Sequence, residues 1–132
     1  MVFPQAAGMI LGIGTDLLDV ARMAKELEEG GPDFREELFT PAEIAYCEAR
    51  RYPARHFAAR FAAKEALLKA LPAAGVTARL RDVEVARTDR EAPRLVLHGA
   101  LREAAERLGV RSLHVSLSHT GQFATASVLL EG

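Results

Sequence analysis

The segment HFAARFAAKEALLKAL, residues 56–71, constrains the fold of this chain more than any other stretch. At about 100° per residue, Phe57, Phe61 and Leu68 fall on one side of a helix. The opposite side carries no charge, because it consists of alanines: Ala59, Ala62, Ala63, Ala66 and Ala70. The pattern therefore predicts a helix, from about Ala54 to Leu71, that is packed on two sides.

The charged side chains of this segment are confined to two bands between the packed sides. Arg60 and Lys64 form one band, and Glu65 and Lys69 form the other. Glu65 and Lys69 could simply be an ion pair one turn apart, which would contribute about 0.3–0.5 kcal/mol. The uncharged alanine side favours a second interpretation, in which charges held at the edge of packed surfaces have specific partners.

A second carboxylate in apolar surroundings lies in the stretch ILGIGTDLLDV, near the N-terminus. Residues from Met9 to Asp16 are typical of a strand that is buried on both faces. A buried carboxylate without a partner costs several kcal/mol. We therefore expect Asp16 to meet another charged group, and Glu65 is the candidate.

Asp16 and Glu65 together suggest a metal site. Two neighbouring carboxylates raise each other's pKa unless a cation lies between them. Oxygen ligands without cysteine suit Mg²⁺, which keeps positions for water and substrate phosphates. Arg60, Lys64 and Lys69 would then face those phosphates. The hypothesis is a chain that handles a phosphorylated substrate with Mg²⁺.

The rest of the chain alternates between helices and short strands. Helices are expected at about Val20–Glu29, which would end at Gly30 and Gly31, and from the capping box Thr40–Glu43 to about Arg50. RDVEVAR and PRLVLHG predict a hairpin, ALREAAERLG a helix, and SLHVSLSH and FATASVLL two further strands. This mixed order favours an α+β fold, and the length favours one domain over residues 1–132.

Composition narrows the classes of function. The 17 Lys and Arg residues nearly balance the 18 Asp and Glu residues, so we expect no nucleic-acid partner. The single cysteine, Cys47, excludes internal disulfides and a cysteine-rich zinc site. No apolar run approaches the ~20 residues that span a bilayer, and no signal peptide is apparent. We expect a cytoplasmic protein without membrane contact.

The predicted strand SLHVSLSH ends in a segment that is rich in serine and histidine. HVSLSHTG places Ser116, Ser118 and His119 there. The serines could be the exposed face of an edge strand, or the strand end could hydrogen-bond a ligand. A hydrolase triad is disfavoured, because the G-x-S-x-G elbow is absent and no aspartate is placed to orient His119.

Three of these segments, in this order and spacing, resemble the holo-acyl-carrier-protein synthase family of small bacterial 4′-phosphopantetheinyl transferases. The family carries G-[IV]-G-x-D, F-A-x-K-E-A-x-x-K-A-L and S-x-S-H blocks, which stand here as GIGTD (12–16), FAAKEALLKAL (61–71) and SLSH (116–119). The resemblance covers nearly the whole chain. It implies the 4′-phosphopantetheinyl transferase fold, with a small, mainly antiparallel sheet packed with a long central helix and shorter helices. It also implies a homotrimer with active sites between subunits.

The resemblance further implies an activity. The 4′-phosphopantetheine group of coenzyme A would be transferred, with Mg²⁺, to a serine of apo acyl carrier protein in fatty acid biosynthesis. The products would be holo-acyl carrier protein and 3′,5′-ADP. Asp16 and Glu65 would be the Mg²⁺ ligands, and Lys69 would approach the transferred phosphate. We expect Glu65 to accept the serine proton, directly or through a metal-bound water.

The resemblance also implies binding residues. Arg60 would lie near the nucleotide phosphates, and Ser118 with His119 near coenzyme A. Arginines of the run ARRYPAR (49–55) would assist at the 3′-phosphate. Pro93 stands where the family often has a Gly-[KR]-Pro turn on the adenine side, although REAPR has Ala92 before it. The implied docking surface for the carrier protein consists of Arg22, Lys25 and Arg35.

Two other functions are compatible with parts of the sequence. One is a non-catalytic module that binds a nucleotide or an acidic protein through its arginines and needs no metal. The other is a dinucleotide-binding oxidoreductase, but that motif requires G-x-G-x-x-G and Leu17 occupies the place of the third glycine.

Overall fold

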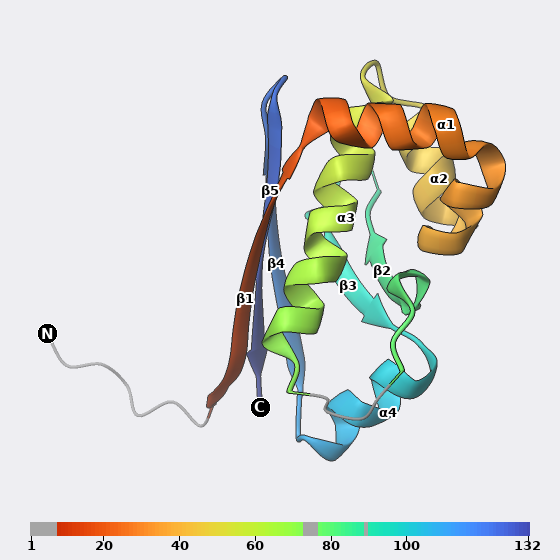
Figure 1. The fold of residues 1–132 in the computed structure, drawn as a ribbon. Helices are drawn as coiled ribbons and strands as arrows, with labels where there is room; N and C mark the ends of the chain where they lie inside the picture. Colours follow the sequence, from red (N-terminus) through yellow and green to blue (C-terminus); the bar gives the residue numbers. More distant parts are fainter. Residues whose placement is uncertain (1–7, 73–76, 89) are drawn as a thin grey trace, which may run out of the picture.

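A long helix lies between two small antiparallel sheets in the computed structural model, which describes residues 8–72, 77–88 and 90–132 (Figure 1). The elements, in chain order, are β1 (Ile10–Asp19), α1 (Val20–Leu38), α2 (Pro41–Glu48), α3 (Pro53–Ala70), η1 (Leu80–Asp82), β2 (Val83–Ala86), β3 (Arg94–Leu97), α4 (Gly99–Arg107), β4 (Ser112–His119) and β5 (Phe123–Glu131). The larger sheet has the order β1-β5-β4, and the smaller one is the β2-β3 hairpin. The expected α+β class is confirmed.

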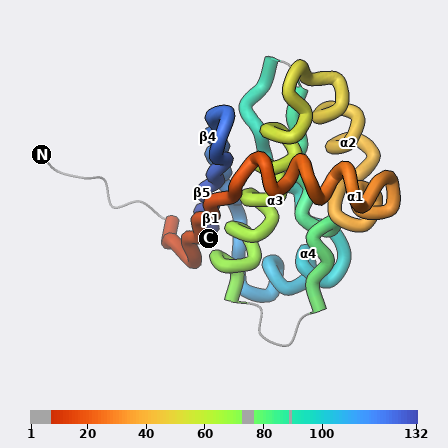
Figure 2. Tube along the Cα trace, turned by 45° about the horizontal axis from the view of Figure 1, so that its top comes forward, coloured from red at the N-terminus to blue at the C-terminus, as the bar shows by residue number. Residues whose placement is uncertain are grey.

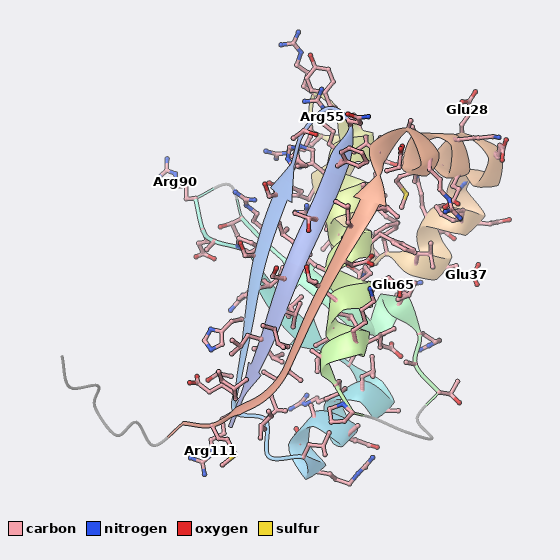
Figure 3. All side chains as sticks on the ribbon, turned by 60° about the vertical axis from the view of Figure 1, so that its left-hand side comes forward. Glu28, Glu37, Arg55, Glu65, Arg90 and Arg111 are labelled. Carbon is pink, nitrogen blue, oxygen red and sulfur yellow. The ribbon has the colours of Figure 1, made fainter. Side chains whose placement is uncertain are left out.

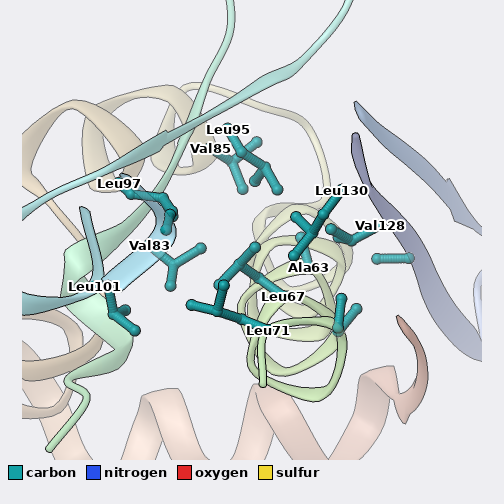
Figure 4. Close-up of a cluster of buried hydrophobic side chains, with 14 of the residues drawn as sticks. Ala63, Leu67, Leu71, Val83, Val85, Leu95, Leu97, Leu101, Val128 and Leu130 are labelled. Carbon is teal, nitrogen blue, oxygen red and sulfur yellow. The ribbon is translucent and has the colours of Figure 1, made fainter. Parts of the chain in front are cut away.

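Helix α3 is packed on two sides, as its sequence predicts. On one side, Ala63 and Leu67 join Val83 of the hairpin and Leu130 of β5 in one apolar cluster, shown in Figure 4. Near its N-terminal end, Phe57 packs in a second cluster with residues of α1 and α2. Figure 2 shows α1 lying across α3 at that end. The alanines of α3 are what allow neighbours to approach this closely.

Strand β1 lies directly on the backbone of α3. A Cβ atom on Gly12 would overlap the carbonyl oxygen of Ala70, and one on Gly14 would overlap that of Ala66. Only glycine therefore allows this approach. Since alternate residues of a strand share a face, Asp16 lies on the same face as the two glycines, toward α3.

The expectation that β1 is buried on both faces is wrong for the isolated chain. The side of β1 that points away from α3 carries Ile13, which is 72% exposed, and Leu17, which is 65% exposed. The apolar run therefore belongs to two faces of the strand. One face packs against α3, and no described residue covers the other. The strand is also longer than expected and ends at Asp19.

Helices α1 and α2 begin as expected and differ from the expectation further along. Helix α1 spans Val20–Leu38 as two helical segments, and the first ends at the glycines as expected, because Gly31 is non-helical at φ 60° and ψ −152° and is followed by Pro32. The glycine signal thus marks a break between two helical segments. Helix α2 ends at Glu48 rather than Arg50, and the expected capping box is confirmed by reciprocal hydrogen bonds of Thr40 and Glu43.

A buried ion pair joins α2, α3 and β2. The Nζ atom of Lys64 lies 2.8 Å from Oε1 of Glu43, and both side chains are 0% exposed. Lys64 also donates to the carbonyl oxygens of Leu80 and Val83, while the other Glu43 oxygen accepts from the backbone of Val85. Burial lowers the pKa of Lys64, and Glu43 opposes that effect. Every polar atom of the pair is thereby satisfied inside the fold.

The Gly14→Ala substitution tests the contact between β1 and α3. We expect it to lower the free energy of unfolding by about 3 kcal/mol or more, because the added methyl group meets backbone that cannot rotate away. Gly31→Ala is the comparison, because a Cβ atom at Gly31 would have no neighbour within 4 Å although φ is positive. This substitution should lower the free energy of unfolding by about 1–2 kcal/mol. Chemical denaturation measures both, and equal costs would contradict the contact.

The Lys64→Met substitution tests the buried ion pair. Removing one partner leaves a buried carboxylate uncompensated, so we expect the free energy of unfolding to fall by about 3–5 kcal/mol. The additional change Glu43→Gln should recover part of that loss. Lys25→Met, at an exposed position of α1, is the control. A Lys64→Met protein as stable as this control would refute the pair's role.

Candidate functional site

Asp16 and Lys69 meet where β1 crosses α3. The Nζ atom of Lys69 lies 2.9 Å from Oδ1 of Asp16 and also donates to the backbone oxygen of Thr15 at 3.1 Å. The Asp16 side chain is 18% exposed and that of Lys69 is 55% exposed, so the pair borders solvent. The expected charged partner of Asp16 was Glu65, whereas its direct partner here is Lys69.

Glu65 lies one helical turn before Lys69, on the part of α3 that β1 passes (Figure 3). It is half-buried. In the described part of the chain, its carboxylate has neither a hydrogen bond nor an ion pair, so the i, i+4 pair with Lys69 does not form. We call Asp16, Glu65 and Lys69 the carboxylate seam. It combines one paired carboxylate, one unpaired carboxylate and one ammonium group.

The carboxylate seam fits a divalent cation that is shared with a substrate. Within the described residues, no group of three or more His, Cys, Asp and Glu side chains could hold a metal ion. Two carboxylates are nevertheless what Mg²⁺ commonly takes from a protein, because phosphates and water complete its octahedron. The Lys69 ammonium, 2.9 Å from Oδ1 of Asp16, now neutralises that carboxylate, so a divalent cation would have to displace it.

Arg60 anchors a second group of polar residues, nearer the start of α3. It is 1% exposed, and its guanidinium lies 4.2 Å from the centre of the Tyr46 ring. One nitrogen donates weakly to the backbone oxygen of His56, at 3.4 Å. Its Nε and second terminal nitrogen have no hydrogen-bond partner among the described residues. Since an unsatisfied buried donor costs about 1–3 kcal/mol, these groups are ready to bind an anion.

His119, at the end of β4, lies beside this arginine. Its ring packs against that of His56, with centroids 4.9 Å apart and an interplanar angle of 66°. Burial lowers the pKa of His119, and the cations Arg55, Arg60 and Arg87 lower it further. Ser118 is exposed and pairs with Thr125 of β5.

Four arginines therefore gather near the two imidazoles. Arg50 lies 4.2 Å from the Tyr46 ring centre and Arg55 lies 4.2 Å from that of Tyr52. Figure 3 shows Arg55 near the ends of the long strands. We call Arg50, Arg55, Arg60 and Arg87 the arginine cluster. Two of its members, Arg50 and Arg55, come from the run ARRYPAR.

Sequence reasoning missed Arg87 and Tyr46. Arg87 follows β2, and Tyr46 lies on α2. Neither carried a signal in the sequence, because their place beside Arg60 depends on how the hairpin and α2 pack around α3. Both line a cavity of about 200 Å³ that also borders Arg94. Pro93 is half-buried and directly precedes β3 at this cavity's edge.

Lys64 belongs to the fold rather than to the anion site. Its ammonium is fully enclosed by Glu43 and two backbone carbonyls. The sequence-based expectation that Lys64 faces phosphates is therefore not supported by the geometry. A lysine and an arginine in the same band of α3 have different environments, because only Lys64 meets a buried carboxylate.

The three basic residues predicted to dock a partner divide into two groups. Arg22 and Lys25 are exposed on α1, at 3.3 Å from Glu26 and 4.0 Å from Glu29, respectively. Arg35 is turned inward: it donates to the backbone oxygen of Leu27 and lies 3.3 Å from Glu48. Arg35 thus links α1 to α2, and only the other two present their charge fully to solvent.

Among the described helices, none is both long enough and apolar enough to cross a bilayer.

Comparisons with known proteins agree on one family. The model of the 4′-phosphopantetheinyl transferase superfamily matches residues 12–126. The chain is 45% identical over 126 residues to the holo-[acyl-carrier-protein] synthase of Koribacter versatilis, covering 93% of this chain and 99% of that protein.

Solved structures agree as well. The holo-[acyl-carrier-protein] synthase of Neisseria meningitidis superposes with a TM-score of 0.83 at 28% identity, over 94% of this chain and all of that one. The Helicobacter pylori synthase, solved in complex with coenzyme A, has a TM-score of 0.75 at 30% identity, over 89% of this chain and 98% of that one. The expected fold is thereby confirmed. The chain is a transferase that belongs to the holo-acyl-carrier-protein synthase family, within the 4′-phosphopantetheinyl transferase superfamily.

Proposed function

We propose that this protein transfers the 4′-phosphopantetheine group of coenzyme A to a serine of apo acyl carrier protein. The observation that carries the proposal is the arrangement of two polar sites along α3. The arginine cluster lies near its start, and the carboxylate seam lies about two turns further on. Coenzyme A carries anionic groups at its nucleotide end and in its pyrophosphate, so it offers a ligand for each site. A non-catalytic binding module would not need the unpaired Glu65.

The residues of the carboxylate seam have complementary roles in this reaction. A Mg²⁺ ion held by Asp16 and Glu65 would neutralise charge on the pyrophosphate oxygens during transfer. Glu65 has no partner among the described residues and would accept the proton of the serine hydroxyl either directly or through a water molecule, the second route leaving it free to hold the cation. Lys69 can turn from Asp16 toward a phosphate oxygen, because its ammonium borders solvent. Positioning and electrostatics account for most of the catalysis in this scheme.

The arginine cluster would bind the nucleotide end of coenzyme A. Arg60 supplies two buried N–H groups that lack acceptors in the described structure, and Arg55 and His119 border the same space. Ser118 and Pro93 lie next to this region and would contact the pantetheine and adenine ends, respectively. The complex of the Helicobacter pylori relative with coenzyme A supports this choice of ligand.

The acceptor would be an acidic carrier protein that docks on α1. Arg22 and Lys25 remain exposed there, and they are the residues we propose for this contact. Arg35 would contribute less, because Leu27 and Glu48 already engage it. The pathway would be fatty acid biosynthesis in the cytoplasm, where both substrates are used.

We further propose that the protein is a homotrimer with active sites between subunits. Ile13 and Leu17 on the outer side of β1 are largely exposed in the single chain. A shallow apolar cavity of about 230 Å³ on the same sheet is lined by Ile13, Val115 and Leu129, among others. Contact with a second copy would remove this apolar surface from water.

Substitution of the seam carboxylates tests the reaction. Glu65→Gln and Asp16→Asn should each slow the transfer at least about 100-fold, as expected for loss of a general base or a metal ligand. The measurement is intact mass of apo acyl carrier protein after incubation with coenzyme A and Mg²⁺. EDTA should have the same effect on the wild type.

Glu103→Gln, at an exposed position of α4, is the matched control and should retain the wild-type rate. Thermal unfolding must show that the seam variants are folded. Near-normal transfer by folded Glu65→Gln would refute the role of Glu65. A wild type that modifies no carrier protein would refute the proposed function.

Light scattering tests the trimer. The wild type should have three times the mass of one chain, whereas Leu17→Asp should reduce that mass by placing a charge on the apolar face. Leu108→Asp is the control, because Leu108 is also exposed, at 41%, but follows α4. A wild type that is monomeric at micromolar concentration would contradict the proposal.

A further inference from the structure

His56 and His119 form a pair of imidazoles inside the arginine cluster. They come from different elements, α3 and the end of β4, and their ring centroids are 4.9 Å apart. Tyr46 of α2 packs edge-on against His56 at 6.0 Å. The backbone oxygen of His56 also accepts the one hydrogen bond that Arg60 donates within the described structure. His56 therefore touches the two residues, His119 and Arg60, that border the proposed phosphate site.

The electrostatic surroundings of both rings are cationic. The pKa of His56 is lowered to about 4, first by burial and then by the nearby groups His119, Arg60, Arg50 and Arg87. The pKa of His119 is lowered by burial and by Arg55, Arg60 and Arg87. Both rings are consequently neutral at pH 7 when no anion is bound.

We propose that His56 is a positioning residue for His119, and that the two imidazoles together take up a proton from solvent when a phosphate group enters the arginine cluster. The proposal rests on the proposed function, because the phosphate is that of the nucleotide end of coenzyme A. An anion close to an imidazole favours its protonated form, which reverses the effect of the surrounding arginines. The edge-on contact with His56 keeps the His119 ring in place while the charge changes.

The sign of the effect follows from linkage. If the complex binds more protons than the free protein, binding strengthens as the pH falls. An anion within about 4–6 Å should raise the pKa of the pair by about one to three pH units. The affinity for the nucleotide should then tighten by up to about tenfold per pH unit across the interval between the free and bound pKa values.

Side-chain ¹⁵N NMR of the four histidines, with and without 3′,5′-ADP, measures this directly. In the free protein, the His56 signal should report a neutral ring down to about pH 5, and His119 should titrate below the ordinary histidine pKa of about 6.5. With saturating 3′,5′-ADP, at least one of them should titrate at higher pH. His98 and His114, which pair with Glu84 and Glu131, serve as internal references. Identical titration of His56 and His119 in both samples would overturn the proposal.

The variant His56→Phe separates proton uptake from packing. Phenylalanine keeps a ring at this position but cannot accept a proton. The Kd for 3′,5′-ADP between pH 5.5 and 7.5 should depend less steeply on pH in this variant than in the wild type. The titration of the phosphate itself is common to both proteins, so the difference in slope belongs to the imidazole pair.

His114→Phe is the matched control and should keep the wild-type slope, because His114 lies on the outer face of β4 and pairs with Glu131. A wild-type slope in folded His56→Phe would also overturn the proposal. Saturable 3′,5′-ADP binding with unchanged imidazole titration refutes this inference alone. Absence of binding, together with no mass increase of apo acyl carrier protein, refutes the proposed function and the inference with it.

Discussion

The contact of the β1 backbone with the α3 backbone, at Gly12 and Gly14, determines where the proposed catalytic groups lie. Once the strand passes this close to the helix, the next residue on the same face, Asp16, must meet the charged band of α3. That band supplies Lys69 at 2.9 Å and, one turn earlier, Glu65, which has no partner among the described residues. Gly12 and Gly14 have no side chain that could react, yet their close approach to α3 brings Asp16 to Lys69.

The other charged band of α3 contains one residue that stabilises the fold and one that is proposed to bind the ligand. Lys64 is buried against Glu43 and two carbonyl oxygens, so its charge is fully compensated inside the protein. Arg60, one turn earlier, is equally buried but retains two donors without acceptors in the described structure. Lys64 and Arg60 are both buried, so burial alone does not distinguish their roles. They differ in how many of their N–H donors have acceptors within the described structure.

The sequence was most informative where a pattern is local. The period of the α3 segment, the Thr40 capping box and the alternation of β4 each follow from neighbouring residues, and the structure confirms them. The partners of Lys64 and Asp16 were not predictable in the same way, because Glu43 already has a local task as a capping residue and Lys69 reaches a strand over 50 residues earlier. The uncovered face of β1 was missed because an apolar run does not reveal which molecule covers it.

The central claim is that Asp16 and Glu65 form one cation site together with the pyrophosphate of coenzyme A. Anomalous diffraction from crystals grown with coenzyme A and Mn²⁺ in place of Mg²⁺ tests it most directly. We expect a manganese peak bonded to both carboxylates and to a pyrophosphate oxygen. A structure with coenzyme A bound, and with manganese absent from these two carboxylates, would contradict it.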